Sequence, residues 1–104
     1  MKDVGQKYGC ESVCYGHAGD GNLHVNILRG HLSESDWLQE VPKGIREIFI
    51  FVKSVGGTIS GEHGIGLVQR PYLDIVFSKT ERRLMRQIKK VFDPRGILNP
   101  GKVV

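Results

Sequence analysis

The sequence predicts an α+β domain in which an antiparallel sheet, including a central β-hairpin, carries two main helices on one face. The first observation is Asp20-Gly21, a strong hairpin signal between two strand-like stretches. The second is an apolar stripe at helical spacing over 45–55, and the third is a similar stripe over 84–92 that follows a capping box. With 104 residues the chain is one domain at most.

The hairpin is expected to pair residues 11–18 with residues 22–29 around a type I′ turn. That turn needs a positive φ at both central residues, which Asp tolerates and Gly adopts freely. With Asp20 and Gly21 as the whole loop, His17 lies directly opposite His24 on one face of the hairpin. The next positions on that face are Tyr15 and Asn26, and the expected core-facing positions are Val13, Val25 and Ile27.

This register depends on the length of the turn. A wider loop that shifted the pairing by one residue would put His17 and His24 on opposite faces of the hairpin. The hypothesis that the two imidazoles cooperate therefore rests on the turn chemistry of Asp20-Gly21.

The remaining elements are expected to be mainly helical. Residues 2–8 form the end of a helix with Gly9 as its C-cap, and 33–40 form a short polar helix. Residues 58–60 are a strand candidate, and 67–77 are irregular or partly helical.

Two long helices are expected. The first runs from Pro42 to Gly56-Gly57, and its apolar stripe is Ile45, Ile48, Phe49, Val52 and Val55. Ile50 and Phe51 make this helix apolar nearly all round. The second runs from the capping box Ser78–Glu81 to Asp93-Pro94 with the stripe Leu84, Met85, Ile88, Val91 and Phe92.

Charge and cysteine content limit the class of protein. The net charge is +4, with basic residues crowded into the C-terminal quarter. Because no aromatic residues interleave with these charges, a solvated helix face is favoured over a nucleic-acid-binding face.

Cys10 and Cys14 share one strand face and suit a disulfide poorly, so reduced thiols of a cytoplasmic protein are expected. No signal peptide is expected, and the longest apolar run, Ile48–Val52, is too short to span a bilayer.

Three histidines lie in glycine-flanked segments and could carry chemistry. His17 and His24, facing each other across the hairpin, can share one metal ion. Glu62 and His63 lie in a loop whose glycines allow close approach to a ligand. Because adjacent residues of an extended loop point in opposite directions, Glu62 is the expected third ligand and His63 the unligated base. The alternative is that these are ordinary loop residues whose glycines serve only the turns.

Other polar residues leave two interpretations open. Asp20 is either a fourth ligand or a turn residue bonded to its own backbone. Asn26 either hydrogen-bonds a substrate or is satisfied by backbone. Arg70 either holds an anionic group bidentately or is an ordinary surface residue.

Three motifs together resemble the C-terminal part of FAD-linked oxidases, in the branch of the glycolate oxidase flavin subunit, D-lactate dehydrogenase and D-2-hydroxyglutarate dehydrogenase. The first is Gly16–Asn26, reading Gly-His-Ala-Gly-Asp-Gly-Asn-Leu-His-Val-Asn. The second is Ser60–Gly66, reading Ser-Gly-Glu-His-Gly-Ile-Gly. The third is Phe92–Lys102, reading Phe-Asp-Pro-Arg-Gly-Ile-Leu-Asn-Pro-Gly-Lys. The resemblance extends over nearly the whole chain.

This resemblance implies a fold, a reaction and roles for six residues. It implies half of a ferredoxin-like cap domain plus a C-terminal tail, in an enzyme that oxidises a D-2-hydroxy acid of the glycolate or D-lactate type to the 2-oxo acid. The implied metal ligands are His17, His24 and Glu62, with zinc as the expected ion. His63 is the implied catalytic base, Asn26 the implied substrate contact, and Asn99 is implied to lie near the FAD.

The resemblance also implies partners. Family members carry an N-terminal FAD-binding domain and the first half of the cap domain, so the chain resembles a C-terminal fragment that is expected to be inactive alone. The expected partners are that FAD domain, a small 2-hydroxy acid and an electron-acceptor subunit, with a cytoplasmic location or one peripheral to the inner membrane. The rival hypotheses are a stand-alone metal-dependent hydrolase and a non-catalytic module that self-associates through the apolar helix around Ile48–Val52.

Overall fold

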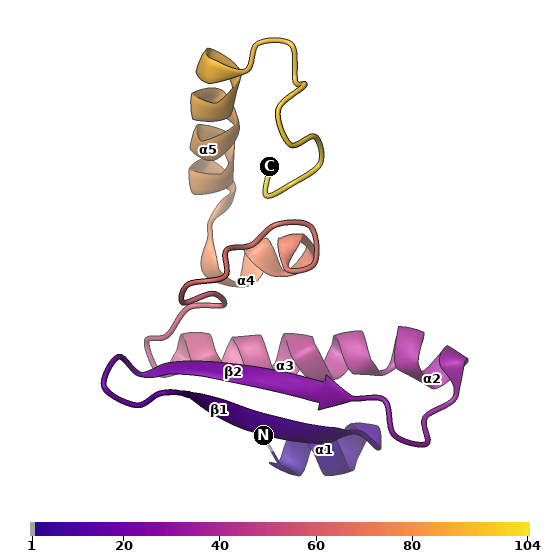
Figure 1. Ribbon diagram of the computed structural model, residues 1–104. Helices are drawn as coiled ribbons and strands as arrows, with labels where there is room; N and C mark the ends of the chain where they lie inside the picture. Colours follow the sequence, from indigo (N-terminus) through magenta and orange to yellow (C-terminus); the bar gives the residue numbers. More distant parts are fainter. Residues whose placement is uncertain (1) are drawn as a thin grey trace.

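The computed structural model describes residues 2–104 and confirms the α+β class. Its sheet is a two-stranded antiparallel hairpin, β1-β2, and the other elements are helical (Figure 1). In chain order the elements are α1 (Lys2–Tyr8), β1 (Glu11–His17), β2 (Asn22–Leu28), α2 (Glu34–Gln39), α3 (Val41–Ser54), the 3₁₀ turn η1 (Arg70–Tyr72), α4 (Leu73–Val76) and α5 (Lys79–Phe92).

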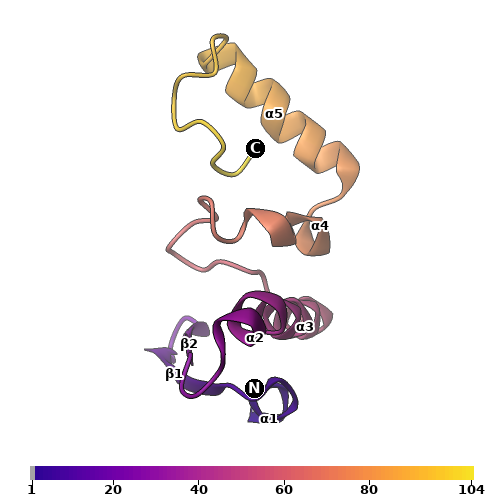
Figure 2. The same cartoon turned by 90° about the vertical axis from the view of Figure 1, so that its right-hand side faces the viewer.

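Helices α1 and α3 lie on the same side of the hairpin, as the end-on view in Figure 2 shows. They approach closely because Gly44 of α3 is buried and packs against the ring of Tyr8. Next to this contact Glu47 accepts hydrogen bonds from Lys7 Nζ at 2.7 Å and from the Tyr8 hydroxyl at 3.0 Å. Gly9 ends α1 with a φ of 66°, as expected of a glycine C-cap.

Helix α3 begins and ends where the sequence predicts. Pro42 occupies its first turn, and Gly56 follows its end with a φ of 84°. Arg46 donates two hydrogen bonds to the Asp74 carboxylate and so joins α3 to α4. Of the predicted stripe, Val55 is exposed together with the flanking Ile50 and Phe51, whereas the half-buried members are Ile45, Ile48, Phe49 and Val52.

Two expectations about strands are wrong. Residues 58–60 do not form a strand: Ile59 is instead one of three buried apolar side chains in the described chain, with Val41 and Leu73. A segment of three residues is at the short limit of strand length, so pairing with the sheet would add few hydrogen bonds to it. Val13, expected to face the core, is 49% exposed, because the helices cover only one side of the hairpin; Val25 and Ile27 are half-buried.

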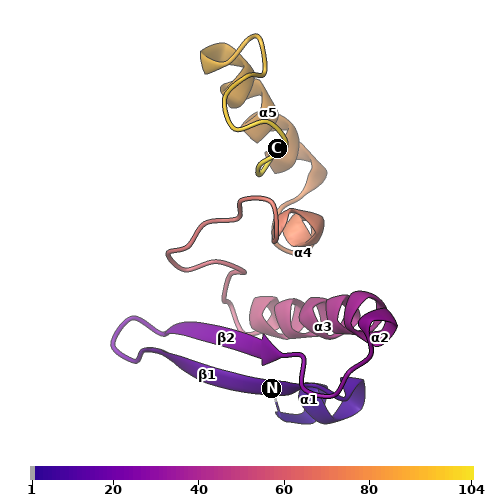
Figure 3. The same ribbon diagram turned by 45° about the vertical axis from the view of Figure 1, so that its right-hand side comes forward.

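Helix α5 lies apart from the sheet, beyond α4 (Figures 1 and 3). Its capping box forms as predicted, with Ser78 and Glu81 exchanging side-chain-to-backbone hydrogen bonds. The expected packing of both long helices on one face of the sheet is therefore seen for α3 and not for α5. The apolar stripe of α5 is largely exposed, with Leu84 at 55% and Phe92 at 79%.

The described chain is extended rather than compact. Its radius of gyration is 15.7 Å, compared with about 13 Å for a compact domain of this length. Cys10, just before β1, and Cys14, within it, are both free thiols. Among residues 2–104, no helix has both the length and the apolar character that crossing a bilayer requires.

Candidate metal centre

The hairpin places four polar or aromatic side chains on one face, with a register that differs from the prediction. His17 pairs with Asn22, and Tyr15 pairs with His24. The loop therefore comprises four residues, 18–21, and the expected two-residue type I′ turn is wrong. Of its two expected central residues only Gly21 has a positive φ, 65°. Because the register moves by two residues, the side-chain parity is unchanged and His17 still shares a face with His24.

Backbone hydrogen bonds hold this four-residue loop. The Asp20 amide donates to the His17 carbonyl oxygen at 3.1 Å, and the Gly21 amide donates to the Ala18 carbonyl oxygen at 3.4 Å. Gly16 allows the strands to approach at the end of the hairpin, because a Cβ there would overlap the carbonyl oxygen of Asn22. Asp20 does not join the group of metal-ligating side chains found among residues 2–104.

The loop after α3 brings Glu62 and His63 to the turn end of the hairpin. Buried Ile59 fixes the segment, and Gly61 then packs directly against the side chain of Asn22, the first residue of β2. A residue with a Cβ could not come this close without displacing the Asn22 side chain. Residues far apart in the sequence therefore meet because one glycine lies against the start of a strand.

The carboxylate of Glu62 lies between three imidazoles. Its Oε1 is 3.1 Å from His24 Nε2, 3.7 Å from His17 Nε2 and 3.7 Å from His63 Nε2. Ligand atoms from His17, His24 and Glu62 all lie within 4.8 Å of one another. Donors that bind zinc at about 2 Å in a tetrahedral site are roughly 3.3–3.5 Å apart. Small side-chain rotations therefore suffice for these three residues to hold one divalent cation.

The chemistry of this donor set also suits a cation. Two imidazole nitrogens and one carboxylate oxygen are a set that leaves a coordination position open for substrate. The His24 side chain is only 14% exposed, whereas those of His17 and Glu62 are about half exposed, at 59% and 49%. The centre therefore has one buried ligand and two ligands at the surface, so a small molecule could reach a bound ion from solvent.

His63 does not point away from Glu62 as adjacent residues of an extended loop would. Its ring stacks on that of His24, with centroids 4.7 Å apart and planes at 26°. The side chain is 72% exposed, more than any other member of the group. The loop is not extended at this point, which is why Glu62 and His63 converge on the same region.

Asn26 and Tyr15 extend the same face. Asn26 Nδ2 donates a hydrogen bond to the Tyr15 hydroxyl at 3.1 Å, so a side chain rather than backbone contacts the Asn26 amide. The Tyr15 ring lies beside that of His24, with centroids 5.2 Å apart. The sequence analysis placed Tyr15 on this face without giving it a role. A hairpin loop of four residues puts Tyr15 directly opposite His24. Predicting that loop length would therefore have identified Tyr15 as a neighbour of His24.

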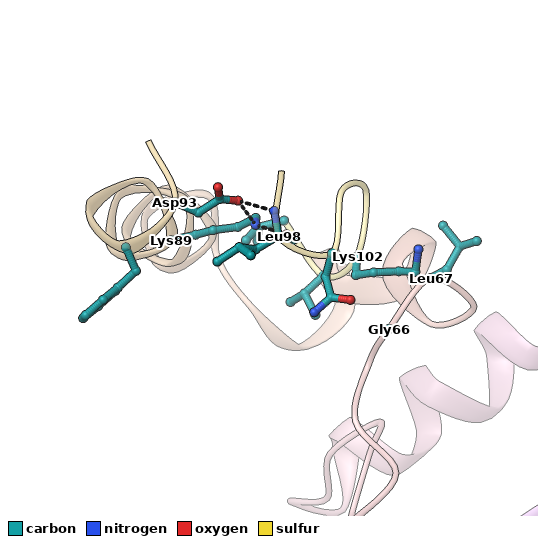
Figure 4. Close-up of a pocket in the computed structure, with 10 residues that line it drawn as sticks. Gly66, Leu67, Lys89, Asp93, Leu98 and Lys102 are labelled. Carbon is teal, nitrogen blue, oxygen red and sulfur yellow. Dashed lines mark hydrogen bonds and ion pairs between the residues drawn. The ribbon is translucent and has the colours of Figure 1, made fainter. Parts of the chain in front are cut away.

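Asn99 lies elsewhere in the molecule, in the tail that follows α5. It has a φ of 45° and lines an open hollow of about 550 Å³ between α5 and the tail. Figure 4 shows Gly66, Leu67, Lys89 and Lys102 around the same hollow. The structure therefore brings His17, His24, Glu62, His63 and Asn26 to one region and leaves Asn99 near α5.

The Asp93 side chain organises the tail that follows α5. From the sequence, Asp93-Pro94 is expected to end the helix, and Asp93 has no further expected role. Asp93 is 6% exposed, and its carboxylate accepts hydrogen bonds from Lys89 Nζ at 2.9 Å and from the Leu98 amide at 3.0 Å (Figure 4). It also accepts a hydrogen bond from the amide of Ile97 at 2.9 Å. The bond from Lys89 and those backbone bonds lower the pKa of the Asp93 carboxyl below its ordinary value of 3.8. Arg70 also serves the tail, since its Nη1 donates to the Gly101 carbonyl oxygen at 3.2 Å.

Comparison with known proteins identifies related sequences. Residues 1–103 match the family described as FAD linked oxidases, C-terminal domain. The chain is 41% identical over 103 residues to the glycolate oxidase subunit GlcD of Bacillus subtilis, covering 99% of the chain and 22% of that protein. It is 44% identical over 102 residues to a D-lactate dehydrogenase of Archaeoglobus fulgidus, covering 98% and 22%. A D-2-hydroxyglutarate dehydrogenase of Stutzerimonas stutzeri is 42% identical over 102 residues, covering 96% and 22%. The chain thus spans about a fifth of the length of these relatives.

Proposed function

The chain belongs to the family of C-terminal domains of FAD-linked oxidases, and from this premise we propose that it is the catalytic C-terminal part of a flavin-dependent enzyme oxidising a D-2-hydroxy acid to the 2-oxo acid. The observation that carries the proposal is the convergence of His17, His24 and Glu62 beside His63. The three relatives bear names that refer to glycolate, D-lactate and D-2-hydroxyglutarate, and all three compounds are 2-hydroxy acids.

The proposed metal ligands are His17, His24 and Glu62, with zinc as the ion. When bound, a divalent cation of this kind lowers the pKa of a hydroxyl group and orients the oxygens of a chelating substrate. The carboxylate and hydroxyl of a 2-hydroxy acid are a pair of oxygens suited to such chelation. The two surface ligands, His17 and Glu62, lie on the side from which the substrate would enter.

His63 is the proposed general base. Its ring is held by stacking on His24 while most of its side chain faces solvent, so its Nε2 can take the proton of the substrate hydroxyl. Histidine is the side chain that most often acts as a general base, and a positioned base contributes typically about 10²–10⁴-fold to the rate. Asn26, on the same hairpin face, is the proposed substrate contact through its amide.

FAD is the proposed redox cofactor, which accepts the hydride from the substrate carbon when it is bound. Asn99 is the residue of this chain proposed to lie near it. The hollow that Asn99 lines with Lys102 offers an amide and a cation to such a ligand. Most of the FAD-binding surface is proposed to lie in an N-terminal domain, because the relatives are about five times as long as this chain. The electron acceptor is proposed to be a separate subunit.

Replacing His63 tests the proposal in the flavin-loaded holoenzyme that carries this chain. His63→Asn removes the base while keeping a side chain of similar size. We expect kcat for D-lactate or glycolate to fall by about 10²-fold or more, with flavin content unchanged in the absorbance spectrum. The matched control is His31→Asn, which alters an exposed histidine outside the group. Turnover by His63→Asn equal to that of the control would contradict the base assignment.

A further inference from the structure

Tyr15 lies at the centre of the polar hairpin face. It is directly opposite His24 in the register of β1 and β2, and paired side chains in an antiparallel hairpin have Cβ atoms roughly 4.5–5.5 Å apart. Its ring is tilted by 34° to that of His24 at a centroid distance of 5.2 Å. The His24 ring also stacks on that of His63, with centroids 4.7 Å apart. His24 therefore has two aromatic neighbours, a tilted tyrosine ring and a stacked imidazole.

These neighbours distinguish the two hairpin histidines. The His24 side chain is 14% exposed, whereas that of His17 is 59% exposed and its ring lies at 80° to that of His24, with centroids 5.8 Å apart. A ring packed against two other rings is restricted in its rotation about the bond to its Cβ. His24 Nε2 is accordingly the imidazole nitrogen closest to Glu62 Oε1, at 3.1 Å.

The Tyr15 hydroxyl makes a second contact of a different kind. It accepts the hydrogen bond from Asn26 Nδ2 at 3.1 Å, which fixes one orientation of the Asn26 amide. Asn26 and His24 are two residues apart on β2 and share a face. One tyrosine thus contacts a proposed metal ligand through its ring and the proposed substrate contact through its hydroxyl.

We propose that Tyr15 is a positioning residue that holds His24 ready for cation binding with its ring and orients Asn26 with its hydroxyl. The inference rests on the proposed function, because it takes His24 as a metal ligand. Removing a group that orients a ligating imidazole usually lowers the metal affinity by about 10–100-fold. The ring and the hydroxyl act on different residues, so two substitutions separate them.

The test is a calorimetric titration of Zn²⁺ into the full chain and two variants. Tyr15→Phe keeps the ring, and we expect its Zn²⁺ affinity to stay within about twofold of wild type. Tyr15→Leu removes the ring, and we expect its affinity to fall about tenfold or more. Ser12→Ala is the matched control, since Ser12 lies on the same strand with its side chain on the other face of the hairpin and pairs with Ile27, and its affinity is expected to match wild type.

A second measurement does not depend on metal or on the stability of Tyr15→Leu. In Tyr15→Phe the side-chain amide protons of Asn26 lose their acceptor, so their NMR signals are expected to shift and to exchange faster with water. In Ser12→Ala, which alters the other face of the hairpin, the Asn26 signals are expected to stay in place. Unchanged Asn26 signals in Tyr15→Phe would overturn the role of the hydroxyl. If a folded Tyr15→Leu variant binds Zn²⁺ as tightly as wild type does, the role of the ring is overturned. That result would reject the positioning role of Tyr15 and leave the proposed metal site standing. Absence of Zn²⁺ binding by wild type would overturn the proposed metal site together with this inference.

Discussion

At the scale of single residues, the candidate site depends on how far each imidazole is restrained. His24 is enclosed, His17 is open to solvent, and His63 is the most exposed of the three. This gradation matches a division of roles in which an ordered ligand fixes the ion and an accessible ring exchanges protons with the substrate. The glycine-rich contexts of these residues identify them from the sequence but do not rank their burial, because that burial depends on the tilted Tyr15 ring and the stacked His63 ring beside His24.

Asp93 gives a prediction for pH. Its pKa is lowered in the folded chain by the bond from Lys89 and by backbone amides, so its ionised form stabilises the tail above about pH 4 and this contribution is lost as the pH falls further. We expect the amides of Ile97 and Leu98 to lose protection below about pH 4, so that their exchange rates measured by NMR rise relative to the intrinsic rates of an unstructured chain at the same pH. In Asp93→Asn this step is expected to disappear.

The control for this experiment is Glu34→Gln, which removes an exposed carboxylate of α2, far from the tail along the chain. It is expected to keep the acid-dependent exchange of both amides. An identical pH profile in Asp93→Asn and wild type would show that another group anchors the tail.

At the scale of elements, local signals predicted the helices well and the turn poorly. The capping box at Ser78, Pro42 in the first turn of α3 and the glycine ends of α1 and α3 are all short-range features, and the structure confirms them. The hairpin loop is two residues longer than expected, because Ala18 and Gly19 join the turn. Since the shift is an even number of residues, the face shared by His17 and His24 was still predicted correctly.

Gly16 provides the test of the hairpin end. In Gly16→Ala the new Cβ meets the backbone carbonyl oxygen of Asn22, which cannot move without separating the strands. We expect the His17–Asn22 pair to open and the Zn²⁺ affinity to fall about tenfold or more, as measured by calorimetry. The control is Gly19→Ala, where the added Cβ has no atom within 4 Å, and which is expected to bind like wild type. Equal affinities in the two variants would mean that the close approach at Gly16 does not position His17.

At the scale of the whole molecule, α5 is the largest departure from expectation. The apolar stripe of an amphipathic helix normally packs against the core of its own domain. For this reason both long helices were predicted to pack on the same face of the sheet. In the described chain α5 instead extends beyond α4 with its stripe exposed, and only Val41, Ile59 and Leu73 are buried apolar side chains. Sequence periodicity identifies the apolar face of a helix but does not say what covers it.

This exposed stripe leads to a prediction about association. Exposed apolar patches of several hundred Å² are rare on soluble monomers, so we expect the chain alone to self-associate as its concentration rises, as followed by sedimentation velocity. Ile88→Glu places a charge in the stripe and is expected to restore a monomer. Gln87→Glu adds the same charge at the neighbouring position, outside the stripe, and is expected to leave association unchanged. A wild-type chain that stays monomeric at millimolar concentration would contradict this expectation.

The central claim is that His17, His24 and Glu62 form one cation site, and a Zn²⁺ titration of the chain against its Glu62→Gln variant tests it most directly. The account predicts one ion per wild-type chain and an affinity at least tenfold lower in Glu62→Gln, whereas the control Glu34→Gln binds as wild type does. Absence of stoichiometric binding by wild type, or an affinity that Glu62→Gln leaves unchanged, would contradict it.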